Sequence, residues 1–188
     1  IGQPGDDAAP LGVRVVKAVA DITESPAGML LLRDDAGALS LETHWNWAGD
    51  LPLSPAMSAN DAAILERSGW IADLDGLAAG DGRITPPDWM VADRRIRALV
   101  PLIHFGRLTG VILLARPAVD RRLDWEDFDM LRAAGRQAAS YISEAQGQQA
   151  LDDAQRFEEF NRRFAFIMHD VKNLISQISL VARNAERH

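Results

Sequence analysis

The sequence has no cysteine among its 188 residues. Disulfide bonds, thiolate metal sites, cysteine nucleophiles and thioether-linked chromophores are therefore excluded, and a reducing, cytoplasmic environment suits the chain. Long apolar runs are also missing. The longest, such as 110–115, are far shorter than the roughly 18 residues needed to cross a bilayer, so we expect no membrane-spanning segment here.

Positive charge is scarce too. The chain has 20 Lys and Arg residues against 27 Asp and Glu residues, so its net charge is −7. Nucleic-acid binding needs a dense basic surface that neutralises phosphates, and we therefore expect no nucleic-acid partner. The sequence also lacks internal repeats, which excludes solenoids and propellers.

What the sequence does contain is the composition of an ordinary folded domain, with 47% hydrophobic and 25% charged residues. The length allows one well-packed domain plus a helical extension. Residues 1–10 are rich in Gly, Pro and Asp, and we expect them to be a linker inside a longer protein.

Local patterns predict helices that alternate with hairpins. Apolar residues recur at helical spacing from Leu11 to Ile22. Two pairs of apolar runs predict hairpins, and the second pair is expected to be central in its sheet. The pairs are 29–33 with 39–47, and 98–105 with 108–115.

The remaining elements are expected in and after a stretch rich in Gly, Pro and Asp, residues 49–95. A short helix is predicted at 61–67 and a strand at 70–71. Asp124 can cap a final helix whose first turn carries two carboxylates, which oppose the positive end of the helix dipole.

The order of these elements over residues 11–142, with the apolar strands 100–103 and 110–114, resembles a GAF domain. The resemblance implies an α+β fold, in which helices flank an antiparallel sheet and a long C-terminal signalling helix follows. It also implies a sensory role with a possible small-molecule ligand. Another antiparallel α/β domain is the alternative, and the residues that would bind a ligand or cofactor stay unknown.

An apolar stripe runs along the last part of the chain, and its members are alternately three and four residues apart. They are Phe157, Phe160, Phe164, Ile167, Val171, Leu174, Ile178, Val181 and Ala185. Met168 and Ile175 widen this apolar stripe, which favours the face of a dimeric four-helix bundle over a narrow coiled coil. We therefore expect a homodimer through this helix.

His169 lies opposite the apolar stripe in the heptad, so we expect it to face solvent. Asp170 adjoins the imidazole in sequence and can orient it or accept its proton, which leaves the other ring nitrogen nucleophilic. Asn173 lies one helical turn later on the same face, where its amide can hold a water molecule. An ordinary surface histidine is the alternative, and these two neighbours favour a chemical role.

Residues 166–174, which read FIMHDVKNL, resemble the H-box of sensor histidine kinases. The resemblance implies that His169 is the phosphoacceptor, that Asp170 is a general base and that Asn173 positions water. Residues 168–174 and 183–188 are particularly similar to the histidine kinases that accompany exosortase and PEP-CTERM protein-sorting systems. That similarity implies a parent anchored in the bacterial inner membrane, and a response regulator that controls surface or exopolysaccharide genes.

No glycine-rich nucleotide lid or ATP-binding domain is found before His188. We therefore expect this chain to be an inactive fragment of a protein-histidine kinase without a cofactor of its own, whose parent would use Mg-ATP. The expected partners are the parent's own ATP-binding domain and a response regulator. The alternative function is a non-enzymatic, GAF-type module for ligand binding and dimerisation.

These interpretations divide the chain into a linker (1–10), a GAF-like sensory domain (11–142), a signalling linker helix (143–156) and the first helix of a truncated phosphoacceptor domain (157–188). A second apolar series is out of phase with the apolar stripe. It comprises Leu131, Ala134, Ala138, Tyr141 and Ala145. The change of phase predicts a slip or hinge within 146–155, with two registers as alternative signalling states, unless the helix simply ends there.

Other candidate site residues are weaker. The histidines His44, His104 and His188 lack a second ligand one helical turn away, so we expect no metal site. Five tryptophans can line a sensory pocket, although core packing is favoured: Trp45, Trp47, Trp70, Trp89 and Trp125. Four arginines can grip an anion, although a solvated charged face is favoured: Arg83, Arg94, Arg95 and Arg97.

Overall fold

The computed structural model describes residues 9–75, 86–119 and 122–185, with side chains as far as Ser176. Two compact units make up the chain, Ile1–Ser143 and Glu144–His188, and each is considered by itself. One helix, α5 (Trp125–Ala185), supplies residues to both units. None of the helices in the described ranges is both long and apolar enough to cross a bilayer.

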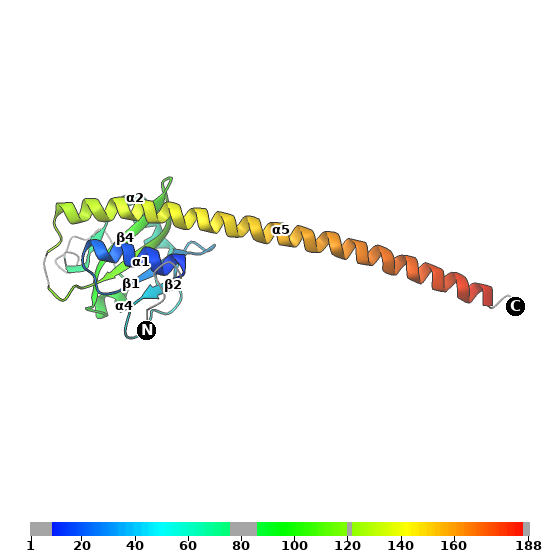
Figure 1. Ribbon diagram of the computed structural model, residues 1–188. Coiled ribbons are helices and arrows are strands. Elements are labelled where there is room, and N and C mark those ends of the chain that lie inside the picture. Colours follow the sequence, from blue (N-terminus) through cyan, green and yellow to red (C-terminus); the bar gives the residue numbers. More distant parts are fainter. Residues whose placement is uncertain (1–8, 76–85, 120–121, 186–188) are drawn as a thin grey trace, which may run out of the picture. The chain divides into compact units, whose positions relative to one another are not determined.

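The first unit contains a five-stranded antiparallel sheet in the order β2-β1-β5-β4-β3 (Figure 1). Its strands are β1 (Gly28–Arg33), β2 (Leu39–Trp45), β3 (Ala72–Asp73), β4 (Ile96–His104) and β5 (Arg107–Ala115). The other helices are α1 (Leu11–Ile22), α2 (Ala59–Ser68) and α4 (Asp88–Ala92). Both predicted hairpins are confirmed, and the second supplies the central strand β5 and its neighbour β4. The α+β fold expected from the sequence is therefore the fold observed.

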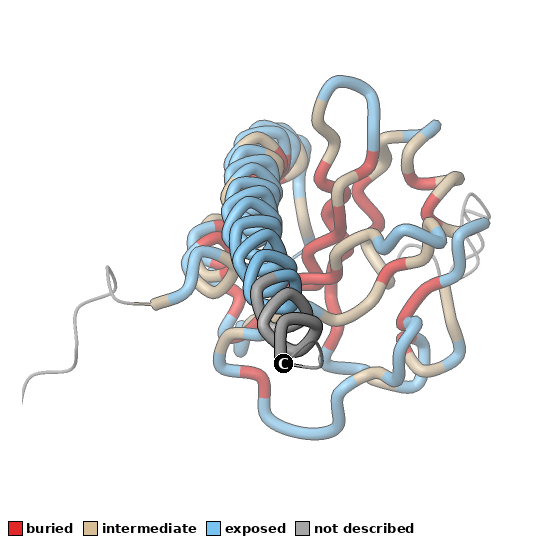
Figure 2. The backbone as a smooth tube through the Cα atoms, turned by 90° about the vertical axis from the view of Figure 1, so that its right-hand side faces the viewer, coloured by how far each residue is buried: buried red, intermediate tan, exposed pale blue. Residues whose placement is uncertain are grey.

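Alternation along the strands gives the sheet two apolar faces, because successive side chains of a strand point to opposite sides. On one face, Leu30, Val100 and Ile112 belong to a core that also contains Val16 of α1 and Leu131 of α5. The opposite face carries Met29, Leu31, Leu99 and Leu113, packed with Met57, Leu65 and Met90. Much of β1, β4 and β5 is red in Figure 2, because burial is concentrated in these strands. Each buried Leu or Ile contributes about 1.5–3 kcal/mol to folding.

Two helices begin with side-chain caps, and the cap predicted at Asp124 is confirmed. Asp124 Oδ1 accepts hydrogen bonds from the backbone N–H groups of Glu126 (2.9 Å) and Asp127 (3.0 Å) at the start of α5. The Asp127 carboxylate in turn accepts from the Asp124 N–H at 2.9 Å. Ser58 and Asp61 form the same reciprocal arrangement at the start of α2. These bonds satisfy N–H groups that have no partner within the helix, so the helix boundaries follow from local sequence.

Glu66 of α2 ties that helix to the sheet. Its Oε2 accepts from the backbone N–H of Leu108 at 2.7 Å and from Arg33 Nη1 at 2.6 Å. The Leu108 hydrogen bond and the Arg33 charge lower the pKa of Glu66 against the opposing effect of burial. One carboxylate thus joins α2 to β1 and β5.

Gly135 lies where α5 packs tightly against the sheet. A Cβ atom at this position would lie 3.1 Å from the carbonyl oxygen of Pro101 and 3.1 Å from Val100 Cγ1. Glycine costs helix stability relative to alanine, by roughly 0.5–1 kcal/mol, and here it allows the helix to reach the β4 backbone. The contact fixes where α5 crosses β4.

Three further expectations about the strands and helices can be compared with the structure. The strand predicted at 70–71 lies two residues later, at Ala72–Asp73. The second apolar series is not a continuous buried stripe, because Tyr141 is 53% exposed and Ala145 is exposed, whereas Ala139 and Ile142 are buried. The side of α5 that packs on the sheet follows the helical period of 3.6 residues, and three turns of this period lead from Leu131 to Ile142. The heptad spacing leads to Tyr141 and Ala145, which lie on the exposed side. The helix α5 continues unbroken through 146–155, so the alternative that the helix ends there is wrong, and the change of register stays a prediction.

The turn between β4 and β5 holds an unusual residue. Phe105 has φ 46° and Gly106 has φ 75°, so both lie in the left-handed region, as a tight two-residue hairpin turn requires. Glycine adopts this conformation without cost, but a bulky side chain does so rarely. The Phe105 ring is 93% exposed and lies 4.2 Å from the His104 ring, centroid to centroid.

Candidate functional site

The three residues that resemble an H-box lie on α5, in the second unit. The His169 side chain is 70% exposed and that of Asp170 is 55% exposed. In Figure 2 this part of the helix is pale blue, because each described residue from 153 to 176 is exposed in this single chain. The phosphoacceptor candidate is therefore open to an incoming group.

The helix brings Asp170 and Asn173 to the same ring nitrogen. Asn173 Nδ2 lies 3.2 Å from His169 Nδ1, as expected for residues one helical turn apart. Asp170 Oδ1 lies 3.6 Å from the same Nδ1, slightly beyond hydrogen-bond distance. Both polar neighbours address Nδ1, and neither of these contacts involves Nε2.

This geometry constrains the protonation of the ring. An amide nitrogen that donates to Nδ1 requires the ring proton on Nε2. Turning the Asn173 amide over places its oxygen against Nδ1, which then carries the proton and leaves the lone pair on Nε2. An Asp170 carboxylate close to Nδ1 favours the second arrangement, since it attracts the Nδ1 proton. The ring can thus present Nε2 as a nucleophile.

A cation lies on the same side of the helix. Lys172 lines a shallow surface hollow together with His169, Ser176 and three apolar residues, Met168, Val171 and Ile175. Ser176 donates its hydroxyl hydrogen to the Lys172 carbonyl oxygen at 2.8 Å. Lys172 did not stand out in the sequence, although its position three residues after His169 is a readable signal.

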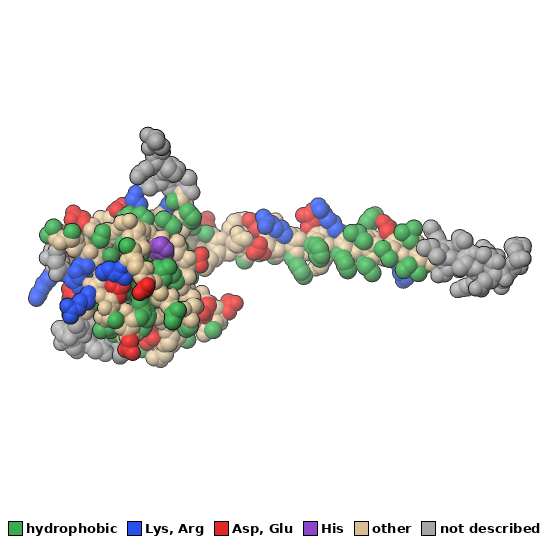
Figure 3. All heavy atoms as spheres, turned by 90° about the horizontal axis from the view of Figure 1, so that it is seen from below, with side chains coloured by type: hydrophobic (Ala, Val, Ile, Leu, Met, Phe, Trp, Pro, Cys, Tyr) green, Lys and Arg blue, Asp and Glu red, His purple; other side chains and the backbone are tan. Residues whose placement is uncertain are grey.

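The apolar stripe is uncovered in the single chain. The described members are between 39% and 64% exposed, and hydrophobic side chains line this part of the helix in Figure 3. The rings of Phe160 and Phe164 stack with centroids 6.1 Å apart. The side chains of Ile178, Val181 and Ala185 lie outside the described residues. Large exposed hydrophobic surfaces mark contact sites in soluble proteins.

Two arginines of the arginine-rich segment, Arg95 and Arg97, form ion pairs, whereas Arg94 is exposed, as expected for a solvated face. Arg97 is buried, with Nη1 2.6 Å from Asp75 Oδ2 and Nε 3.3 Å from Asp73 Oδ1. Arg116 also bonds Asp75, and this bond, with the charge of Arg97, lowers the Asp75 pKa despite its partial burial. Arg83 lies outside the described residues. The expectation of a solvated face is therefore wrong for Arg97.

Arg95 has a different set of contacts. It bonds the Asp93 carboxylate and the carbonyl of Ala48, and its guanidinium lies 5.1 Å from the centre of the Trp47 ring. The hydrogen bond from Arg95 lowers the pKa of Asp93. Asp93, Arg95 and Trp89 line one open hollow with residues 50–53 and Ala92.

The tryptophans follow the core expectation with one exception. Trp47 is buried, while Trp45, Trp70 and Trp89 are partly buried against the two cores. Trp89 Nε1 donates to the Ala56 carbonyl at 2.7 Å. Trp125 is 72% exposed, so the expectation of core packing is wrong there, because Trp125 is the first residue of α5.

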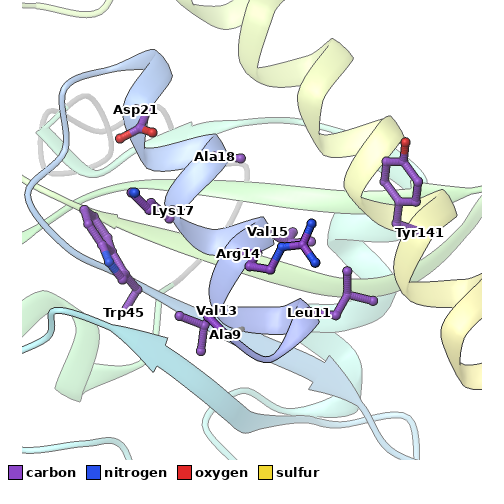
Figure 4. A pocket seen from close by; sticks show the side chains of 10 residues that line it. All are labelled: Ala9, Leu11, Val13, Arg14, Val15, Lys17, Ala18, Asp21, Trp45 and Tyr141. Carbon is purple, nitrogen blue, oxygen red and sulfur yellow. The ribbon is translucent and has the colours of Figure 1, made fainter. Parts of the chain in front are cut away.

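A hollow of about 560 Å³ lies beside α1 (Figure 4). Trp45 of β2 and Tyr141 of α5 stand on opposite sides of α1, which contributes Arg14 and Lys17. The hollow is open and follows the outer surface of a helix, so it does not enclose a ligand. Within the described ranges, no three His, Asp or Glu side chains gather as a metal site would require.

Comparison with known proteins identifies the fold of the first unit. No protein-family model and no curated protein sequence matches the chain. A methyl-accepting chemotaxis protein fragment matches with a TM-score of 0.54 and 19% identity, over 70% of this chain and 86% of that one. The GAF domain of the cyanobacteriochrome TePixJ gives 0.55 and 13%, over 75% and 98%.

The GAF domain of an Acinetobacter phosphoenolpyruvate-protein phosphotransferase is also similar, with a TM-score of 0.53 and 12% identity, over 76% of this chain and 87% of that one. At these identities the similarity establishes a GAF-like fold. It does not transfer a ligand or an activity, because one fold serves many functions.

Proposed function

We propose that this chain is the sensory and phosphoacceptor part of a two-component sensor histidine kinase. The observation that supports the proposal is the arrangement at His169, where Asp170 and Asn173 both lie at Nδ1 on an exposed helical face. The GAF-like fold of the first unit fits a sensory role. The resemblance of residues 166–174 to an H-box supplies the reaction class.

The proposed chemistry follows from the ring geometry. His169 Nε2 attacks the γ-phosphorus of Mg-ATP held by the parent's ATP-binding domain, an N–P bond forms, and the P–O bond to ADP breaks. The Nδ1 proton passes to Asp170 as the ring loses its positive charge. The phosphoryl group then moves to an aspartate of a response regulator, and Asn173 positions water for its later hydrolysis.

The proposal includes a homodimer. Covering the apolar stripe with the same surface of a second copy removes several large side chains from water, at about 25 cal/mol per Å² of apolar surface. We assign the parent to the PEP-CTERM-associated histidine kinases, anchored in the bacterial inner membrane, on the similarity of residues 168–174 and 183–188.

The dimer is tested by replacing an apolar residue of the stripe with a charged one. Ile167→Glu should convert the chain to a monomer in analytical ultracentrifugation, because an unpaired carboxylate cannot be buried at low cost. Gln155→Glu lies on the same exposed helix, two heptads before His169 and therefore opposite the stripe, and it should leave the dimer intact. Equal masses for the wild-type chain and Ile167→Glu would count against the dimer.

Phosphoryl transfer is tested by supplying the parent's ATP-binding domain and Mg-ATP. Acid-labile phosphate should appear on the chain, and His169→Gln should abolish it. Asn173→Ala should retain labelling but slow the dephosphorylation of the response regulator. If the wild-type chain is not labelled in its full-length parent, the non-enzymatic ligand-binding and dimerisation module becomes the better description. The uncovered apolar stripe supports that second function, because dimerisation needs no chemistry at His169.

A further inference from the structure

The cations of the second unit are not equivalent. Three arginines there each have an acidic residue three or four positions earlier: Arg156, Arg162 and Arg163. Such spacing places opposite charges side by side on a helix, and Arg163 indeed pairs with Glu159. Lys172 differs from all three. Its helical neighbours are Met168, His169, Ile175 and Ser176, and none of them is acidic.

Lys172 is therefore an exposed cation whose only titratable neighbour one turn away is the phosphoacceptor candidate. No ion pair of Lys172 occurs among the described residues. Its side chain lines the same hollow as His169, so the ammonium and the imidazole share one patch of helix surface.

A phosphoryl group on His169 places negative charge next to Asp170, and this charge needs a positive partner. A phosphoryl group carries about −1.5 to −2 charges at neutral pH, and Asp170 adds a further negative charge beside it. His169 lies within a long helix, where backbone N–H groups bond within the helix and cannot hold an anion. The residues one turn earlier, Ala165 and Phe166, are apolar.

We propose that the Lys172 ammonium binds the oxygens of the phosphoryl group that His169 receives. The inference rests on the proposed function, and it names Lys172 as the positive group that pairs with the phosphoryl group at His169. Lys172 offsets the negative charge as the N–P bond forms, and it offsets the repulsion between the phosphoryl group and Asp170 in the product. A charge-assisted contact of this kind is stronger than a neutral hydrogen bond.

The test measures the initial rate of acid-labile labelling in the parent protein with Mg-ATP. Lys172→Gln should lower that rate about tenfold, since the contact is exposed and weaker than a buried oxyanion contact. Lys172→Arg should restore most of it, because the positive charge is retained. The difference between Lys172→Gln and wild type should shrink as ionic strength rises.

Arg163→Gln is the matched control. It removes one positive charge from the same helix, about two and a half turns earlier, where Glu159 already pairs with the arginine. Labelling should be unchanged. Helix content by circular dichroism should be the same for all variants, because these side chains are exposed.

The outcomes separate this inference from the proposed function. A wild-type parent that is never labelled contradicts both. Labelling of Lys172→Gln at the wild-type rate, with His169→Gln unlabelled, leaves the phosphoacceptor role intact and overturns the role of Lys172. A normal labelling rate combined with slower transfer to the response regulator also overturns it, because Lys172 would then bind the partner protein instead of the phosphoryl group.

Discussion

At the scale of single residues, Phe105 is a bulky residue in a backbone conformation that favours glycine. An L-residue in the left-handed region costs about 1 kcal/mol, whereas Asn and Gly are tolerated there. Phe105→Asn gives the turn Asn-Gly, the pair that two-residue hairpins prefer, and should raise the free energy of unfolding by about 0.5–1 kcal/mol in urea titrations.

Phe105→Ala is the control for this prediction. It removes the same exposed ring and the same contact with His104, but it keeps a Cβ atom in the left-handed region. Little or no gain is expected from it. Equal stabilisation by Asn and Ala would show that the ring, and not the backbone, causes the effect.

Glu66 should make the free energy of unfolding fall at acidic pH. Its pKa is lowered in the folded protein, chiefly by the Leu108 N–H and then by Arg33, from the usual value of 4.5. Its contribution is therefore complete above that value and is lost as pH falls through the lower, folded pKa. Urea unfolding at pH 7 and at about pH 3 should show a smaller acid loss for Glu66→Gln than for wild type.

Arg33→Gln should reduce the same acid dependence by a smaller amount, because the Leu108 hydrogen bond remains. An acid loss in Glu66→Gln as large as that of wild type would assign the effect to other carboxylates, of which Asp75 and Asp93 also have lowered pKa values.

Sequence reasoning at this scale succeeded where the relevant neighbours are local. The contact between Asn173 and His169 could be predicted because helical geometry alone brings residues four apart together. The buried pairs of Arg97 could not, since Asp73 and Asp75 reach it only through the pairing of β3 with β4. Trp125 looked like a core residue because hydrophobicity does not reveal that a side chain occupies the first position of a helix.

At the scale of elements, helices and strands were predicted correctly where the apolar residues follow a single spacing, either helical or alternating. The limits of α1 and both hairpins follow from apolar spacing and turn residues. Strand β3 was misplaced because it has only two residues, and its pairing with β4 defines it more than its own sequence does. The second apolar series is only partly buried. Alanines are frequent in this segment, so several different spacings can be drawn through it, and the sequence does not show which of them faces the sheet.

The unbroken α5 supports a test of the signalling helix. Inserting one alanine after Gln148 turns every later residue by about 100° relative to the earlier ones, without breaking the helix. The side chains there are exposed, so the insertion should cost little stability. Kinase output, read as the labelling rate of His169, should change.

A seven-residue insertion at the same place nearly restores the phase and is the control, because seven residues make almost two full turns, leaving a difference of only about 20°. It should return the labelling rate towards that of wild type. Unchanged output after the single insertion would rule out a dependence on helix phase.

At the scale of the whole molecule, the division into two units leads to different kinds of stability. No residue beyond Ile142 is buried among those described, so both cores lie in the first unit. A chain ending at Ser143 should unfold cooperatively, with a midpoint within a few degrees of the longer chain in thermal denaturation. A midpoint lowered by ten degrees or more would show that the second unit stabilises the first.

The second unit alone should behave differently. Residues 144–185 are helical, none of them as far as Ser176 is buried, and isolated helices in water are only marginally stable. Its helicity by circular dichroism should therefore rise with concentration as copies cover the apolar stripe. Helicity that is independent of concentration would contradict association through that surface.

The contact at Gly135 has a mechanical consequence. Elsewhere between α5 and the sheet, side chains can change rotamer and absorb a small displacement, whereas a glycine against the Pro101 carbonyl oxygen cannot. A tilt of β4 is therefore passed to α5 without slack at this position. We therefore expect the first turns of α5 to follow β4 most directly at Gly135.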